Sequence, residues 1–183
     1  MNQKQNETKP RIYVASLSDY NAGRLLGRWI DANQSVEKLH ADIREMLAES
    51  KEPPAEEWAI HDYEGFGGLQ LAEYASMEDV AGLAKGIEEH GRVFAELTNH
   101  FGGLSGLEEA RKYMEEGYRG EYESIGDYVE QLLEDCYGDV LRALPDFIRY
   151  HIDRDGIASD MEMGGDIFII EVGRAAHVFD ANL

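Results

Sequence analysis

Nine carboxylates and a single base, Arg119, lie between Glu115 and Asp139 of this chain. Within this segment, Ser124 and Asp127 have the spacing of an N-cap pair, which is typical of the start of a helix. Apolar residues then follow at three- and four-residue intervals, the spacing of a stripe on the buried face of a helix. The stripe is expected to consist of Ile125, Tyr128, Val129, Leu132, Leu133 and Cys136. The segment therefore predicts an amphipathic helix with one acidic face.

The acid on this helix makes the helix less stable. Asp127, Glu130 and Glu134 stand three and four residues apart, and like charges at that spacing cost about 0.2 to 0.5 kcal/mol per pair. Asp135 and Asp139 lie towards the C-terminal end, where the helix dipole disfavours anions. Stability alone would not select this pattern, so we interpret it as functional.

The whole chain is acidic, with 37 Asp and Glu against 17 Lys and Arg and a formal charge of −20. The acidic residues are concentrated in blocks. Residues 42–90 alone hold thirteen acids and three bases. Such a charge opposes nucleic acid and anionic membranes as partners and favours a basic partner. The alternative is that an acidic surface serves only solubility.

The sequence indicates a cytoplasmic protein. Cys136 is the only cysteine, which leaves neither a disulfide framework nor a thiolate metal site. The first nine residues are polar and lack the apolar core of a signal peptide, and no apolar run approaches the roughly 18 residues of a membrane span. Hydrophobic residues make up 43% of the chain, enough to bury a core.

The pattern of elements predicts an α+β fold built as an elongated chain of three small domains. Residues 1–66 form an α+β domain, with a disordered leader at 1–10, strands at 12–15, 27–32 and 58–63, and a helix from Ser35 until Pro53 and Pro54. Residues 67–117 form a helical domain, with helices opened by Ser76 and by Ser105. Residues 118–183 form an α+β domain with the acidic helix, a helix capped by Asp153, a terminal hairpin at 167–179 and the expected dimer interface.

Known catalytic and cofactor-binding motifs, compared with the sequence one at a time, do not match it. The cluster at Gly65, Gly67 and Gly68 lacks the third glycine of a dinucleotide fingerprint, and Ser105 is not flanked as in a nucleophile elbow but suits a helix N-cap. Paired carboxylates can act in glycoside hydrolysis, but nothing marks out one pair among so many. We therefore expect that the protein is not an enzyme, has no catalytic residue and binds neither a cofactor nor a metal.

The nearest approach to a metal motif is an EF-hand-like loop. Asp153, Asp155, Gly156 and Glu162 fall at loop positions 3, 5, 6 and 12, but position 1 is His151 in place of the usual aspartate. A hard cation loses a charged ligand there. Helix capping by Asp153 is the interpretation that we prefer, with calcium binding as its alternative.

Several strings resemble the ArdA family of antirestriction proteins, in an order and spacing that cover nearly the whole chain from residue 11. They are residues 11–16 (RIYVAS), 21–23 (NAG), 27–32 (GRWIDA), 57–66 (EWAIHDYEGF), 132–137 (LLEDCY) and 165–168 (GDIF). The most specific are 27–32 and 57–66. The acidic segment around residues 132–139 is similar to the antirestriction motif of the family.

This resemblance implies a DNA mimic, encoded by mobile genetic elements, that occupies the DNA-binding groove of type I restriction-modification enzymes. It also implies a curved homodimer joined through the C-terminal domains. Duplex DNA carries one charge per roughly 1.7 Å, so the combined charge of two copies equals that of about 70 Å of duplex, some 20 base pairs. The alternative is an acidic interaction module for another basic DNA-binding protein, such as a nucleoid protein or a regulator.

Acids in two parts of the chain are expected to imitate phosphates. The first set is Glu115, Glu116, Glu121, Glu123, Asp127, Glu130, Glu134, Asp135 and Asp139, and the supporting set is Glu56, Glu57, Asp62, Glu64, Glu73, Glu78, Asp79, Glu88 and Glu89. Such groups can replace phosphates because a groove's basic side chains contact the DNA backbone largely without regard to base identity.

Overall fold

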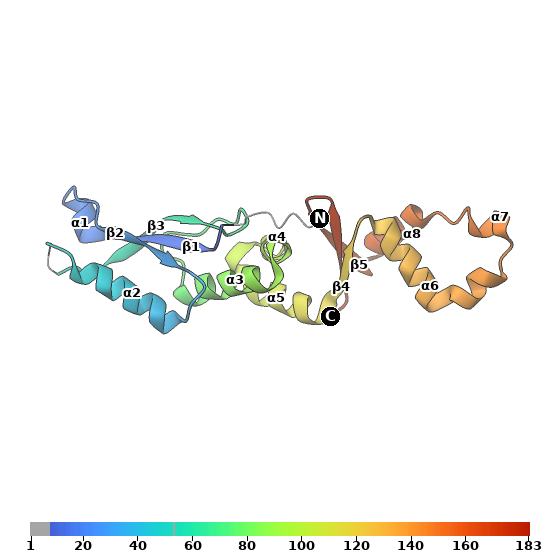
Figure 1. Ribbon diagram of the computed structural model, residues 1–183, viewed down its shortest axis with the longest axis horizontal. Coiled ribbons are helices and arrows are strands. Elements are labelled where there is room, and N and C mark those ends of the chain that lie inside the picture. Colours follow the sequence, from blue (N-terminus) through green and yellow to red (C-terminus); the bar gives the residue numbers. More distant parts are fainter. Residues whose placement is uncertain (1–7, 53) are drawn as a thin grey trace. The chain divides into compact units, whose positions relative to one another are not determined.

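The computed structural model describes residues 8–52 and 54–183, which form two compact units (Figure 1). One unit ends at Ala110 and the other runs from Arg111 to Leu183. The predicted α+β class is confirmed, since the described residues form helices and two three-stranded antiparallel sheets. Residues 1–7 of the predicted disordered leader lie outside the described part. Pro10 is buried, and its carbonyl accepts a hydrogen bond from the Ala32 N–H at 2.9 Å.

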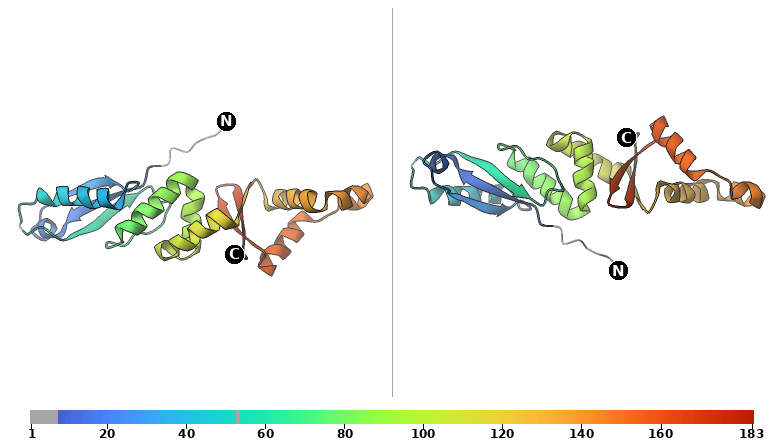
Figure 2. Two further views of the ribbon diagram at one scale, coloured as in Figure 1. Left: turned by 90° about the horizontal axis from the view of Figure 1, so that it is seen from below. Right: turned by 90° about the horizontal axis from the view of Figure 1, so that it is seen from above.

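The first unit begins with a sheet covered by one helix (Figure 2). Strands β1 (Arg11–Ser16), β2 (Gly27–Asp31) and β3 (Trp58–Glu64) correspond to the three predicted strands and pair in the order β2-β1-β3. Helix α2 (Val36–Ala48) starts directly after Ser35, in agreement with the predicted start, and buries its apolar stripe of Leu39, Ile43 and Met46. It ends before the two prolines that were expected to stop it, and Pro53 lies outside the described residues. A short helix, α1 (Leu17–Asn21), lies between β1 and β2.

Two helices in close contact continue this unit. Helix α3 (Met77–His90) begins as predicted at Ser76, whose hydroxyl accepts the Asp79 N–H at 3.0 Å, and ends at Gly91. Helix α4 (Arg92–His100) crosses it closely, because a Cβ on Gly86 would lie 2.1 Å from the Phe94 ring. Glycine at this position therefore sets how near the two helices approach.

The predicted cap at Ser105 is wrong. Ser105 lies inside a 3₁₀ turn (Gly103–Gly106) that runs directly into α5 (Leu107–Lys112), so the chain is already helical at this residue. The Ser105 hydroxyl donates to the Gly102 carbonyl at 3.1 Å. The second unit begins at Arg111, within α5, and a π-helical turn (Tyr113–Gly117) follows.

A buried carboxylate joins the loop after α2 to the start of α1. Asp19 is 2% exposed and accepts hydrogen bonds from the hydroxyls of Ser50 and of Ser16, the latter at 2.9 Å. Arg24 lies 3.2 Å from the same carboxylate. The hydrogen bond from Ser50, together with those from Ser16 and Arg24, holds the pKa of Asp19 below its usual range despite the opposing effect of burial.

We expect Asp19→Asn to lower the melting temperature at pH 7. The folded state holds this pKa below the unfolded value of about 3.9, so the carboxylate stabilises the fold above that pH. That contribution disappears as the pH falls through the folded value. Thermal unfolding of both proteins from pH 7 to pH 2.5 should therefore show a difference that shrinks below about pH 4. A difference independent of pH would mean that the charge of Asp19 has no part in it.

The second unit combines a sheet with two packed helices. Strands β4 (Tyr118–Tyr122), β5 (Ile167–Val172) and β6 (Ala175–Asp180) pair in the order β4-β6-β5. The β5-β6 hairpin was predicted from the sequence, whereas β4 was not. Helices α6 (Ile125–Ala143), α7 (Asp146–Arg149) and α8 (Arg154–Gly164) complete the unit. Asp153 caps α8 by accepting the Gly156 N–H at 2.9 Å, which confirms the capping interpretation.

Only the first half of α6 belongs to the core of this unit. Tyr128 and Val129 are buried against Ala158, Ile167 and Val178, and the predicted stripe residues Ile125, Leu132 and Leu133 pack at the edge of this cluster. Cys136 is exposed, so its predicted place on the buried stripe is wrong. The reason is that the buried side chains of α6, Tyr128 and Val129, lie in its first half, whereas the second half extends away from the sheet together with α7 (Figure 1).

Candidate partner-binding surface

Helix α6 presents a row of exposed carboxylates. Ser124 fixes its first turn, since the hydroxyl accepts the Asp127 N–H at 3.2 Å and donates to the Asp127 carboxylate at 2.7 Å. The core contacts of Tyr128 and Val129 then orient the helix, so that its acids face solvent. Five of the predicted carboxylates lie on this helix, and all are exposed: Asp127, Glu130, Glu134, Asp135 and Asp139.

Two arginines partly neutralise the negative charge of this row. Sequence reasoning missed these ion pairs. Arg142 contacts Glu134 at 2.5 Å and Asp139 at 2.8 Å, and Arg154 of α8 contacts Glu130 at 3.1 Å. The i,i+3 spacing of Asp139 and Arg142 was visible in the sequence, whereas the contact from α8 depends on the fold. The repulsion within the row is therefore smaller than the sequence alone suggested.

The one base of the segment does not form an ion pair with the acids before α6. Arg119, the single base of the segment, contacts Asp180 on β6 at 2.5 Å and lowers the pKa of that carboxyl. Burial lowers the pKa of His177, so its ring is neutral near pH 7 and does not offset the charge of Glu121. Six exposed carboxylates of the segment from Glu115 to Asp139 make no ion pair within residues 8–52 and 54–183: Glu115, Glu116, Glu121, Glu123, Asp127 and Asp135. Negative charge thus remains in excess on this unit.

The supporting acids lie on several elements of the first unit. Glu64 on β3 is half-buried and contacts Arg11 at 2.5 Å, and Asp79 is half-buried in the first turn of α3. Glu89 near the end of α3 contacts Lys85 at 3.7 Å. The remaining predicted acids of this unit are exposed: Glu56, Glu57, Asp62, Glu73, Glu78, Glu88 and Glu89.

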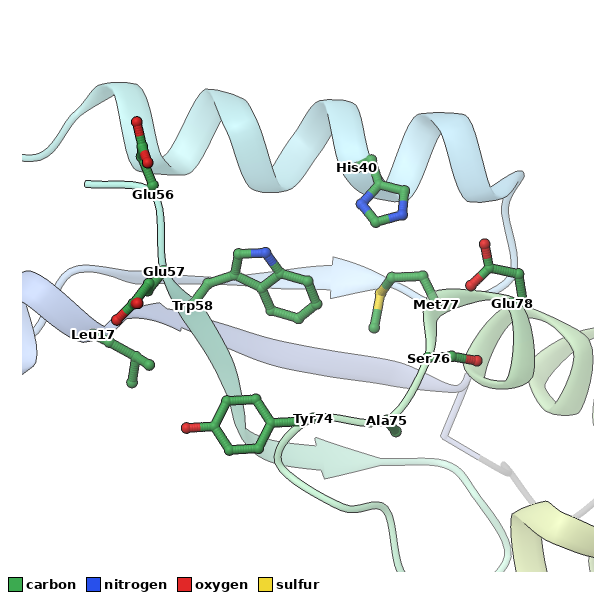
Figure 3. Close-up of a pocket in the computed structure, with 10 residues that line it drawn as sticks. All are labelled: Leu17, His40, Glu56, Glu57, Trp58, Tyr74, Ala75, Ser76, Met77 and Glu78. Carbon is green, nitrogen blue, oxygen red and sulfur yellow. The ribbon is translucent and has the colours of Figure 1, made fainter. Parts of the chain in front are cut away.

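Three of these acids line one cleft of about 550 Å³ (Figure 3). Glu56 and Glu57 precede β3, and Glu78 belongs to the first turn of α3. Between them lie the side chains of Trp58 and Tyr74. Sequence reasoning selected the acids individually but missed the cleft, because residues from α1, α2, β3 and α3 line it.

The second half of α6 and the following segment also expose apolar side chains. Phe147 is 72% exposed and Tyr150 is 73% exposed, although large aromatic residues are usually well buried. The other large apolar residues exposed in this unit are Tyr137, Val140, Ile148, Met163 and Leu183. Acid and exposed apolar area therefore occur on the same helix.

The described residues offer no constellation for metal chemistry or membrane insertion. No group of three or more His, Cys, Asp or Glu side chains within them is arranged to hold a metal ion. None of the helices in the same part of the chain has the length and apolar content needed to cross a bilayer.

Comparison with known proteins identifies the family. A search of curated proteins gives no match. The model of the ArdA antirestriction proteins matches residues 12–175, which include both described units almost entirely and all the carboxylates predicted to bind the partner. The resemblance seen in the sequence is thereby confirmed. The chain belongs to the ArdA family of antirestriction proteins, whose members counteract restriction enzymes.

Proposed function

We propose that this protein is a DNA mimic that occupies the DNA-binding groove of type I restriction-modification enzymes and thereby blocks restriction. The observation that carries the proposal is the row of exposed carboxylates on α6, held on a helix whose opposite face is fixed by Tyr128 and Val129. Membership of an antirestriction family supports the same conclusion.

The mechanism is competition for basic side chains. Lys and Arg in a DNA groove contact phosphates mainly through charge and position, and carboxylates on a rigid helix can satisfy the same side chains. The exposed acids before α6 belong to the same unit as α6, and the first unit carries a further set of exposed acids. An enzyme occupied in this way cannot bind DNA for cleavage, and modification is blocked too wherever it uses the same groove.

Mutually exclusive binding tests the proposal. A purified type I methyltransferase core is bound to a labelled recognition duplex, and increasing protein is expected to displace the duplex completely. A ternary complex of enzyme, duplex and protein would contradict it. Capture of a nucleoid protein or a regulator, with no binding to the methyltransferase core, would favour the alternative of a general acidic interaction module.

Arg142→Gln is expected to strengthen binding of the cationic partner by about twofold to fivefold. The substitution frees the carboxylates of Glu134 and Asp139, which Arg142 now contacts. Arg44→Gln is the matched control, since it makes the same change in net charge at an exposed arginine without an ion pair within the described residues. Titration calorimetry against the methyltransferase core would compare them. Equal effects of the two substitutions would mean that only net charge matters.

We further propose that two copies associate through the second unit and act in the cytoplasm. The exposed apolar side chains of α6 and α7, among them Phe147 and Tyr150, support such contacts. Sedimentation equilibrium should give twice the chain mass of 20.6 kDa. A single-chain mass at all concentrations would contradict this part of the proposal.

A further inference from the structure

The cleft that contains Trp58 has the composition of a site for one organic cation. Its walls are apolar or aromatic and include Trp58, Tyr74 and Met77, whereas Glu56, Glu57 and Glu78 supply carboxylates. In the view of Figure 3 the indole lies between His40 and Tyr74, with Glu56 and Glu57 towards one end and Glu78 towards the other. No lysine or arginine is among the described residues that line it.

The cleft is formed before any ligand arrives. The Leu17 N–H donates to the Glu57 carbonyl at 3.1 Å, and the Ile60 N–H donates to the Glu73 carbonyl at 2.9 Å. The first hydrogen bond fixes the residue before Trp58 to the start of α1, and the second fixes the strand that carries Trp58 to the segment that carries Tyr74. Met77 is 2% exposed and anchors the start of α3, whereas Tyr74 is 69% exposed and offers its ring to an incoming group. A preformed cleft avoids the entropic cost of ordering its walls on binding.

The cleft does not suit an anion, although α3 begins beside it. The N-terminus of α3 would favour negative charge by itself. However, Ser76 caps it by accepting the Asp79 N–H, and Glu78 and Asp79 place two carboxylates in the first turn. Glu56, Glu57 and Glu78 make no ion pair within the described part of the chain, so their charge is available to a cation.

We propose that this cleft receives an arginine side chain of the protein partner. A guanidinium stacks on aromatic faces and pairs with carboxylates, and its aliphatic stem suits apolar walls such as Met77. Lysine shares the charge but lacks the planar group. The identity of the partner rests on the proposed function, whereas the preference for arginine rests on the cleft alone. The site adds a discrete anchor to an otherwise diffuse charged surface.

Trp58 itself reports occupancy of the cleft. The chain has two tryptophans, so Trp29→Phe leaves Trp58 as the only one. We expect the peptide amide Gly-Arg-Gly to change the fluorescence of this variant with a saturable curve at constant ionic strength. The same peptide with citrulline, which is the uncharged isostere of arginine, should give no saturable change, and Gly-Lys-Gly should bind several-fold more weakly. Equal responses to arginine and citrulline would overturn the proposal.

Tyr74→Ala tests the anchor in the complex with the methyltransferase core. It removes one aromatic wall, keeps the net charge and affects a side chain that contributes little to the core, so we expect about a tenfold loss of affinity. Tyr20→Ala is the control, because Tyr20 is also exposed, at 53%, and lies outside the cleft. Unchanged affinity of Tyr74→Ala, with DNA still displaced, would reject the anchor and leave the mimicry intact. Failure of the wild-type protein to displace DNA would reject the mimicry, and the peptide titration would still decide the cleft.

Discussion

Replacing four carboxylates of α6 by amides is expected to weaken binding to a type I methyltransferase core by about thirtyfold to a thousandfold. The changes are Glu130→Gln, Glu134→Gln, Asp135→Asn and Asp139→Asn. Exposed ion pairs contribute up to about 1 kcal/mol each, and about 1.4 kcal/mol corresponds to a factor of ten in affinity. Asp127 is left in place because it takes part in the cap with Ser124.

The expected loss is large because the replacement also unmasks cations. Arg142 and Arg154 contact three of the four carboxylates. Replacing these carboxylates leaves two unpaired arginines on the surface that binds the basic groove. A single change such as Glu134→Gln should weaken binding only a few-fold, since the charge is distributed. A tenfold or greater loss from that one change would indicate a discrete site on α6 instead.

The matched control for the fourfold variant makes the same change in net charge elsewhere. It replaces Glu37, Glu45, Glu49 and Glu52 by glutamine, two of which contact Arg28 and one of which contacts Arg24. Circular dichroism should show α6 intact in the fourfold variant, because removing anions near a helix C-terminus favours the helix. Equal losses from the two sets would show that position on α6 is irrelevant.

Raising the salt concentration from about 50 to 200 mM is expected to weaken the complex by about a hundredfold, whereas DNA in such a groove loses about 10³ to 10⁵. From Asp127 to Asp139 the helix rises about 18 Å at 1.5 Å per residue and carries five carboxylates, about one per 4 Å. DNA carries one charge per roughly 1.7 Å and holds a denser layer of counterions, which are released on binding. The protein should therefore compete with DNA better as the salt concentration rises.

Dissociation constants measured at several salt concentrations for the protein and for the duplex would give the two slopes of log affinity against log salt. The fourfold variant should have a shallower slope than the wild type. A slope near zero for the wild type would indicate an apolar interface, and a slope as steep as that of DNA would contradict the argument from charge density.

Local signals in the sequence predicted most elements but not the long-range pairing. The hairpin of β5 and β6 is predicted by its own turn, whereas β4 pairs with β6 across more than 50 residues and is interrupted at Gly120, where the register shifts. The predicted cap at Ser105 was wrong because the residue pattern does not reveal the 3₁₀ turn that contains this residue. Periodicity placed Cys136 on the buried face, but periodicity cannot show where the core ends.

The candidate surface was likewise predictable only in part. The acidic residues could be selected from charge and spacing, and their exposure could be inferred because isolated charges are rarely buried. Their ion-pair partners could not be predicted from the sequence, since Arg154 contacts Glu130 from another helix. The cleft needs His40, Trp58 and Tyr74 to converge from separate segments, which no local pattern encodes.

The limited support of α6 has a consequence for its local stability. Beyond Leu133 the helix has few buried side chains, so its backbone amides are protected mainly by the helix itself, with Arg142 bracing the last turns through Glu134 and Asp139. Such segments open at a lower free energy than the core of the same unit. A bound receptor would suppress that opening, and hydrogen exchange in the final turns of α6 would slow on complex formation while exchange at Val129 stayed unchanged.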